Sequence, residues 1–274
     1  MAIEKALSGR EIAISTSDSQ DMLELGLSEQ HLKDAMTEIA RNLLALGSNL
    51  NYGGDLRQYG FSELLFELVA RYSLDFDDTE TTTRITNYLA WPVHIRMTAD
   101  VIKQNSKKVG EFAKLVYLDL DGNILSEKEK LKKLPHERTD AEWSRGLTAM
   151  RELVSKKTYA RIVLGGQIEG FKGLMPGIAE EGLISLRSRQ PLYLVGGFGG
   201  CTRLICKTLK LIEEPNYMPK SEWQKDFLDF NESNLNNGLL DEENRQLAMT
   251  PHVDQAIILI LRGLLRLLNI KSNA

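Results

Sequence analysis

The chain has 274 residues, of which 42% are hydrophobic and 26% charged, and its formal net charge is −4. This composition is typical of a soluble globular protein, and without a basic stripe it argues against nucleic acid as a partner. The longest apolar stretch, residues 256–268, contains two arginines and is too short to span a bilayer. Residues 1–10 lack a hydrophobic signal core, so we expect a cytoplasmic protein that does not contact a membrane.

The two cysteines, Cys201 and Cys206, lie five residues apart beside a run of glycines. This spacing fits neither a metal site nor a disulfide framework, and cytoplasmic thiols stay reduced. We therefore predict two reduced packing thiols, no metal site and no cofactor.

The first predicted strand, Glu11–Ser15, leads into a turn rich in hydroxyl groups over residues 16–19. Such hydroxyl groups can bond a phosphate or a ribose, and they can equally cap the element that follows. Ser15 and Ser17 are therefore candidate ligand-binding residues. An amphipathic helix is predicted next, over residues 28–47.

A second strand, over residues 49–52, ends in Gly53, Gly54 and Asp55, and Arg57 follows before the next helix. Asp55 and Arg57 stand where polar groups could bond ribose hydroxyls or a phosphate. The alternative is that they form a salt bridge within the loop or cap the helix.

A third strand is predicted over residues 84–91 and a fourth over residues 113–120. His94 follows the third strand and could act as a general base, although a lone histidine is more often structural. A long helix over residues 141–156 carries Arg145 on its apolar side.

The stretch from Tyr159 to Cys206 carries the clearest pattern. A strand over residues 161–164 ends in a glycine pair, and a glycine-rich loop leads to a helix with two glutamates in its first turn. A strand over residues 191–195 ends in another glycine pair before a helix over residues 201–211. This succession is typical of βαβ units in a parallel sheet. The residues concerned are Gly165, Gly166, Gly173, Pro176, Gly177, Glu180, Glu181, Gly196, Gly197 and Arg203.

A glycine loop before a helix has a simple chemistry. Glycine allows a positive φ and a close approach of the backbone to a ligand. The helix behind the loop presents free N–H groups and the positive end of its dipole, and together they favour an anion, most often a phosphate. The alternative is that the glycines only close tight turns. In an open α/β sheet, ligands bind outside the carboxyl ends of the strands.

The chain changes character after residue 211. A polar segment precedes a final helix, predicted over residues 252–269, which is apolar on most sides. Such a helix either enters the core or packs on another subunit, and we favour a contact between subunits. We therefore predict a Rossmann-like α/β domain over residues 8–211, with an open, mainly parallel sheet, and a helical C-terminal extension over residues 212–274. The extension packs on the domain or on another subunit.

Two motifs carry a resemblance to a known family. They are Y-G-G-D-L-R at residues 52–57 and V-L-G-G followed by G-L-M-P-G-I-A-E-E between residues 163 and 181. Over roughly residues 10–211 the chain resembles the SLOG superfamily, a Rossmann-like group. It includes the LOG nucleotide glycosidases, DprA proteins and sensor domains of bacterial defence proteins. The motifs look most like the defence-associated branch, which includes the sensor domains of Thoeris effectors and is similar to the sensing domain of TRPM channels.

The resemblance implies a site for ADP-ribose, a cyclic ADP-ribose isomer or a related nucleotide at the carboxyl edge of the sheet. Together with the glycine loops, it gives these candidate ligand-binding residues: Ser15, Ser17, Gly53, Gly54, Asp55, Arg57, Gly165, Gly166, Gly173, Pro176, Gly177, Glu181, Gly196, Gly197 and Arg203.

The glycosidase branch carries P-G-G-x-G-T-x-x-E, whose final glutamate acts with an upstream arginine on the N-glycosidic bond. Here Gly177 and Glu181 match the second half, but Gly173 stands in place of the proline. Arg145 can be matched with the upstream arginine, although Gly146 stands where a lysine is expected. These departures favour a phosphate-binding loop without hydrolysis. If the chain is an enzyme, Glu181 and Arg145 are the candidate catalytic residues.

Two functions therefore compete. The first is a sensor that binds an ADP-ribose-type signal in bacterial anti-phage or stress signalling and reports it through a homo-oligomer or an effector protein. The second is a nucleotide N-glycosidase that uses Glu181. An ordinary NAD-binding fold fits less well, because no G-x-G-x-x-G directly follows a predicted strand and Thr202 stands where the third glycine of Gly197-Phe198-Gly199 would be.

Overall fold

The structure is a computed structural model that describes residues 5–75, 83–110, 113–132 and 136–272. Six parallel strands form one sheet in the order β4-β3-β2-β1-β5-β6. β1 lies at the centre, where Ile14 pairs with Ile162 of β5 and Ile12 pairs with Leu50 of β2. The strands are β1 (Glu11–Ser17), β2 (Asn49–Gly53), β3 (Ile85–Leu89), β4 (Ala113–Tyr117), β5 (Ala160–Gly165) and β6 (Leu192–Val195).

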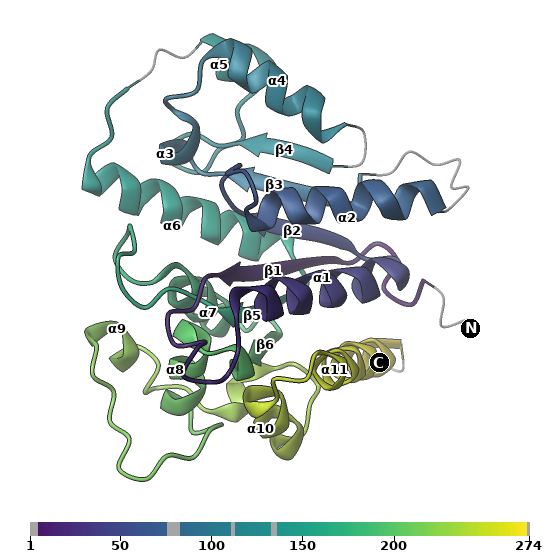
Figure 1. Ribbon diagram of the computed structural model, residues 1–274, viewed down its shortest axis with the longest axis vertical. Coiled ribbons are helices and arrows are strands. Elements are labelled where there is room, and N and C mark those ends of the chain that lie inside the picture. The colour runs from purple at the N-terminus through teal and green to yellow at the C-terminus, as the bar shows by residue number, and fades with distance from the viewer. Residues whose placement is uncertain (1–4, 76–82, 111–112, 133–135, 273–274) are drawn as a thin grey trace.

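Helices cover both faces of the sheet (Figure 1). On one face α1, α2 and α11 share a core of apolar side chains, and on the other α6, α7 and α8 pack behind the strands. The long helices are α1 (Glu29–Ala45), α2 (Phe61–Asp75), α4 (Ala99–Val109), α6 (Asp140–Lys157), α7 (Gly177–Arg187), α8 (Gly200–Thr208) and α11 (Val253–Ser272). This architecture confirms the predicted Rossmann-like α/β fold with C-terminal helices.

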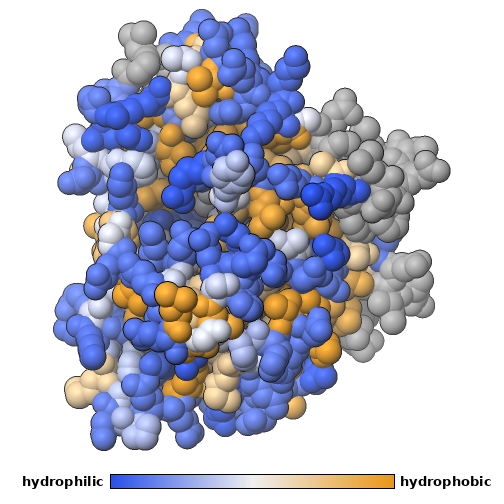
Figure 2. All heavy atoms as spheres, in the orientation of Figure 1, coloured by the Kyte–Doolittle hydropathy of each residue, from blue (hydrophilic) through white to orange (hydrophobic). Residues whose placement is uncertain are grey.

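Simple sequence signals position these helices. In α1 the buried residues Leu32, Met36, Ile39 and Leu43 recur every three or four positions, so they form one stripe against the sheet. Thr139 caps α6, since its hydroxyl accepts the amide of Glu142 while its own amide donates to the carboxylate of that residue at 2.9 Å. Figure 2 shows one face of the molecule, on which hydrophilic residues predominate and apolar residues are visible in patches between them.

Two strands end earlier than predicted. The third strand ends at Leu89, and residues predicted as its last part enter a short helix, α3 (Trp91–His94), because Pro92 fits a first helical turn. The fourth strand ends at Tyr117. His94 is fully buried, and its Nε2 lies 2.7 Å from the carbonyl oxygen of Leu118. Its place in the core is structural.

Short elements complete the chain: α5 (Glu127–Lys132), α9 (Glu222–Lys225), α10 (Asp241–Met249) and two 3₁₀ turns, η1 (Gly196–Phe198) and η2 (Glu232–Leu235). α11 packs beside α1, and its residues Ile260 and Leu264 are buried in the core of this chain. On the outer side of the helix Ile258 is 56% exposed. In the described part of the chain, no helix is long and apolar enough to cross a membrane.

The glycine pair after β6 lies under the C-terminal extension. A Cβ at Gly197 would overlap the carbonyl group of Thr250, and one at Gly196 would lie 2.5 Å from the carbonyl oxygen of Ala248. These glycines therefore allow α10 to approach the end of β6.

We expect Gly197→Ala to lower the free energy of unfolding by about 3 kcal/mol or more, at the upper end of overpacking costs. Gly182→Ala is the matched control. It lies inside α7 and the nearest atom to its added Cβ is 3.7 Å away, so it should gain up to about 1 kcal/mol. Urea unfolding measures both, and equal stabilities of the two variants would contradict this packing.

Glu243 joins α10 to α11. Its carboxylate lies 2.8 Å from Arg262 Nη1 and also pairs with Arg266. The hydrogen bond from Arg266 is the main reason that the pKa of Glu243 falls from its ordinary 4.5 to about 2, and the amide of Leu240 and Arg262 add to it.

A lowered carboxylate pKa stabilises the fold above the ordinary pKa, and this contribution is lost as the pH falls through the folded-state pKa. We therefore expect the stability difference between the natural chain and Glu243→Gln to shrink between pH 4.5 and about 2. Urea unfolding at a series of pH values tests this, and a constant difference across that window would refute it.

Candidate functional site

A cleft of about 500 Å³ opens at the carboxyl edge of the sheet, the side to which the strand arrowheads point in Figure 1. It lies beside β1, where the strand order reverses from β2 on one side to β5 on the other, the position at which open α/β sheets bind ligands. The ends of β1, β2 and β3 line it, together with α6, the first turn of α7 and the loop after β5. Its principal lining residues are Thr16, Ser17, Gly53, Gly54, Asp55, Arg57, Tyr88, Arg138, Trp143, Arg151, Gln167, Phe171, Lys172, Gly177 and Glu181.

The cleft is rich in cations and aromatic rings. Arg138 and Lys172 both lie over the ring of Trp143, at 4.8 and 4.5 Å from its centroid. Tyr88 and Phe171 also line the cleft. A ring flanked by cations offers a stacking surface and positive charge at one place, a combination that suits an aromatic group linked to phosphate.

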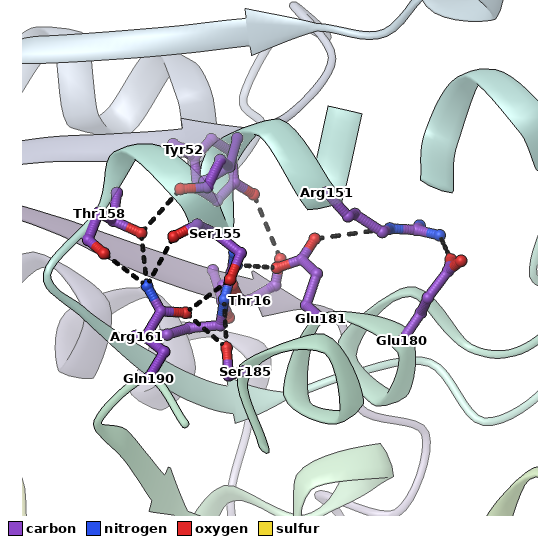
Figure 3. Close-up of polar contacts among 12 residues, drawn as sticks. Thr16, Tyr52, Arg151, Ser155, Thr158, Arg161, Glu180, Glu181, Ser185 and Gln190 are labelled. Atoms are coloured by element: carbon purple, nitrogen blue, oxygen red, sulfur yellow. Dashed lines mark hydrogen bonds and ion pairs between the residues drawn. The ribbon is translucent and has the colours of Figure 1, made fainter. Parts of the chain in front are cut away.

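Two buried arginines enclose the carboxylate of Glu181 (Figure 3). Arg161, on β5, donates from Nη1 to Glu181 Oε2 at 2.7 Å, and Arg151, on α6, places its Nε 3.7 Å from Oε1. Arg151 also pairs with Glu180, which accepts a second hydrogen bond from Thr148. The two arginines and the two glutamates thus form one network of ion pairs behind the cleft.

Arg161 is only 2% exposed, and two of its three guanidinium nitrogens, Nε and Nη1, donate hydrogen bonds to side chains. It donates from Nη1 to Ser15 at 2.7 Å and from Nε to Ser185 at 3.1 Å, and Ser185 in turn bonds Gln190. Burial lowers the pKa of Arg161, and the carboxylate of Glu181 acts against this shift. Ser15 therefore supports the ion pair from within the sheet.

Tyr52 lies on the other side of the pair. Its hydroxyl donates to the carbonyl oxygen of Thr16 at 3.2 Å. Burial raises the pKa of Tyr52, and the negative charge of Glu181 raises it further. The phenol therefore remains protonated and acts as a donor.

Glycine at the start of α7 makes room for Arg151. A Cβ on Gly177 would lie 2.7 Å from Nη2 of Arg151. The arginine thus lies across the N-terminus of α7, where the helix dipole alone would attract an anion. A Cβ on Gly173, whose φ is +133°, would lie 3.7 Å from Nη1 of the same guanidinium group.

Gly165 and Gly166 lie at a crossing inside the fold. Both have positive φ, and a Cβ on Gly165 would lie 2.7 Å from the carbonyl oxygen of Ser17. The carbonyl oxygen of Gly166 accepts the amide of Cys201 at 2.8 Å. These two glycines let the end of β5 pass between β1 and α8.

Of the predicted ligand-binding residues, Ser17, Gly53, Gly54, Asp55, Arg57, Gly177 and Glu181 line the cleft. Ser15 binds Arg161, and Pro176 is the residue before α7. Asp55 and Arg57 form an ion pair with each other at 2.7 Å. This is the loop salt bridge that the sequence left open, at a place that also faces the cleft.

The second glycine loop has other partners. The amide of Gly200, at the start of α8, donates to the carboxylate of Asp21 at 2.7 Å, so an internal anion already occupies this helix N-terminus. Gly196 and Gly197 pack under α10. Arg203 interacts electrostatically with Cys206 and Glu214.

Arg145 and Arg151 lie on the same helix in different surroundings. The side chain of Arg145 is 60% exposed and pairs with Asp121, whereas that of Arg151 is 8% exposed and pairs with Glu180 and Glu181. The arginine next to the candidate catalytic carboxylate is therefore Arg151. The sequence signal was an arginine interrupting the apolar face of α6, and Arg161 interrupts an apolar strand in the same way.

Arg138, Trp143 and Lys172 also line the cleft without having been predicted as site residues. Arg138 and Trp143 lie at or just before the start of α6 and Lys172 lies in the loop after β5, so no single motif contains them. Thr16, from the hydroxyl-rich turn, lines the cleft as well. Within the described residues, no cluster of three or more His, Cys, Asp or Glu could hold a metal ion.

Comparison with protein families gives a match over most of the chain. The family model described as SLOG cluster2 matches residues 6–230. The chain belongs to the SLOG family. The match extends beyond the predicted end of the domain, to the segment that carries α9. A comparison with curated proteins gave no match. Membership in SLOG suggests nucleotide-related binding or a glycosidase-like function.

The ion pair between Arg161 and Glu181 makes a measurable contribution to the stability of the fold. We expect Arg161→Met to destabilise the fold by about 3–5 kcal/mol, because it leaves Glu181 buried without its nearest cation. Arg145→Met removes an exposed pair and should cost less than about 1 kcal/mol. Urea unfolding at pH 7 compares them, and a loss for Arg161→Met as small as that for Arg145→Met would contradict the role given to this pair.

Proposed function

We propose that this SLOG protein binds a nucleotide-derived signal, such as ADP-ribose or a cyclic ADP-ribose isomer, in the cleft at the carboxyl edge of the sheet. The observation that carries the proposal is that one cleft contains both an aromatic ring and cations. Arg138 and Lys172 lie over the ring of Trp143, and Arg151 lines the same cleft. An aromatic surface suits a nucleobase, and the surrounding cations suit phosphate.

Binding without hydrolysis is favoured by the contacts of Glu181. A general acid must lie within hydrogen-bond reach of the atom that it protonates. The carboxylate of Glu181 is instead engaged by two arginines, whose nitrogens lie 2.7 and 3.7 Å from it. These contacts suit a fixed anion that orients Arg151 toward the cleft.

A nucleotide N-glycosidase is the second candidate. The observation in its favour is that Glu181 lines the cleft, where a carboxylate could stabilise the positive charge that develops on a ribose as its glycosidic bond breaks. In that reaction Arg151, rather than Arg145, would be the arginine beside the carboxylate.

We further propose that the protein acts as a sensor in bacterial anti-phage or stress signalling. A binding domain without chemistry of its own needs another chain to carry its output, either further copies of itself or an effector protein. On the outer side of α11, Ile258 is an exposed apolar side chain that could take part in such a contact.

Calorimetry with ADP-ribose, cyclic ADP-ribose isomers, NAD and AMP tests the binding function, with the products separated by chromatography. We expect at least one ligand to bind and to be recovered intact. Release of free base, abolished in Glu181→Gln, would establish the glycosidase instead. Binding of none of these ligands would overturn the proposal.

Trp143→Leu should lower the affinity for the ligand about tenfold or more, since loss of stacking on one base costs about 1–3 kcal/mol. Trp91→Leu is the matched control, because Trp91 contacts His136 at 5.7 Å between ring centroids and belongs to α3. The affinity of the Trp91→Leu variant for the ligand should remain within about twofold of that of the natural chain. Equal effects of the two substitutions would argue against stacking on Trp143.

A further inference from the structure

A second cavity adjoins the cleft. It has a volume of about 430 Å³ and lies between the ends of β1 and β2 and the first turns of α1 and α2, and we call it the α2 cavity. The cleft lies by α6 and α7, on the other face of the sheet. The residues that line both spaces are Thr16, Ser17, Gly53, Gly54, Asp55 and Arg57.

A glycine pair forms part of the boundary between the two spaces. A Cβ on Gly53 would lie 2.8 Å from Met150, which lines the cleft, and one on Gly54 would overlap the ring of Tyr52, which lines the α2 cavity. Because these side chains approach the backbone so closely, the boundary is thin at Gly53 and Gly54.

Thr16 is another residue at this boundary. Thr16 is 6% exposed, and its Oγ1 is buried without a hydrogen-bond partner among the described residues. Buried hydroxyl groups are nearly always bonded in folded proteins. Because Thr16 lines both spaces, a rotation of its side chain would turn this hydroxyl group toward a ligand atom at the boundary and give it the missing partner.

The two spaces differ in charge. Besides the shared pair of Asp55 and Arg57, the cleft carries three cations against one carboxylate, whereas the α2 cavity carries Asp18 and Glu29 against Lys33. Lys33 already pairs with Glu29 at 2.6 Å. Carboxylates are strong acceptors for sugar hydroxyl groups, and they repel phosphate.

We propose that the cleft and the α2 cavity form one site for a two-ended ligand. The nucleoside and phosphate part occupies the cationic cleft, the chain crosses Gly53 and Gly54 beside Thr16, and a second sugar with free hydroxyl groups occupies the α2 cavity near Asp18. The inference rests on the proposed binding function and narrows it. It selects a dinucleotide or a nucleoside diphosphate bearing a second sugar over a nucleoside monophosphate.

Calorimetry with ADP-ribose and AMP tests the proposal, since the two share one end and differ in the second sugar phosphate. The natural chain should bind ADP-ribose at least about tenfold more tightly than AMP, the effect of one hydrogen bond to a charged group. Asp18→Asn should remove most of that difference and leave the affinity for AMP within about twofold.

Thr16→Val separates binding from stability. It removes a hydroxyl group that has no partner in the free protein, so the melting temperature should stay the same or rise, while the affinity for ADP-ribose falls about fivefold. Thr208→Val is the matched control. Its hydroxyl bonds the carbonyl oxygen of Leu204 within α8, so we expect a small loss of melting temperature and no change in affinity.

Three results would overturn the two-ended site and leave the binding function intact. They are equal affinities of the natural chain for ADP-ribose and AMP, an unchanged or higher affinity for ADP-ribose in Asp18→Asn, and an unchanged affinity in Thr16→Val. Each would confine the ligand to the cleft. Failure of the natural chain to bind either nucleotide, or any other ligand of the earlier screen, would overturn the binding function as well.

Discussion

The ion pair between Glu181 and Arg161 connects the parts of the fold that form the cleft. Glu181 belongs to α7 and Arg161 to β5, so the pair fixes the helix that follows the glycine loop against the centre of the sheet. Ser15 ties the same guanidinium group to β1, and Arg151 brings in α6. A buried charge without a partner is strongly destabilising. These four elements must therefore come together for the first turn of α7 to hold its position.

This arrangement also sets the chemistry that the cleft offers. The carboxylate of Glu181 forms ion pairs with two arginines. Trp143 and its two flanking cations, in contrast, line the cleft. The buried ion pairs of Glu180 and Glu181 thus lie behind the cleft, whereas Arg138 and Lys172 lie beside its aromatic ring. The proposal of a phosphorylated aromatic ligand rests on this arrangement.

Glycine serves two different purposes in this chain, although the sequence pattern around each pair is similar. Gly177 admits a guanidinium group to the start of a helix, while Gly196 and Gly197 admit the backbone of the C-terminal extension. At the second loop an internal carboxylate, Asp21, takes the position that an anionic ligand would need. A glycine loop before a helix is therefore a binding site only where the fold leaves that position open.

The sequence by itself determined the fold class, the parallel sheet and the edge on which the cleft opens. Apolar strands that end in glycine pairs, alternating with amphipathic helices, are local patterns, and parallel βαβ units bring strand ends to one edge. The motif between residues 163 and 181 also indicated the SLOG family, which the family match bears out.

Only the tertiary structure decided which residues meet at the cleft. The sequence indicated Arg145 as the arginine of the site, but the rotation of α6 exposes Arg145 and buries Arg151 beside the carboxylates. Gly196 and Gly197 looked like a ligand loop until a segment about fifty residues later in the chain was seen to cover them. The unpartnered hydroxyl of Thr16 has no sequence signature, since a missing hydrogen bond is a property of the packed neighbours. Local pattern sets where strands end, and long-range packing sets what each strand end faces.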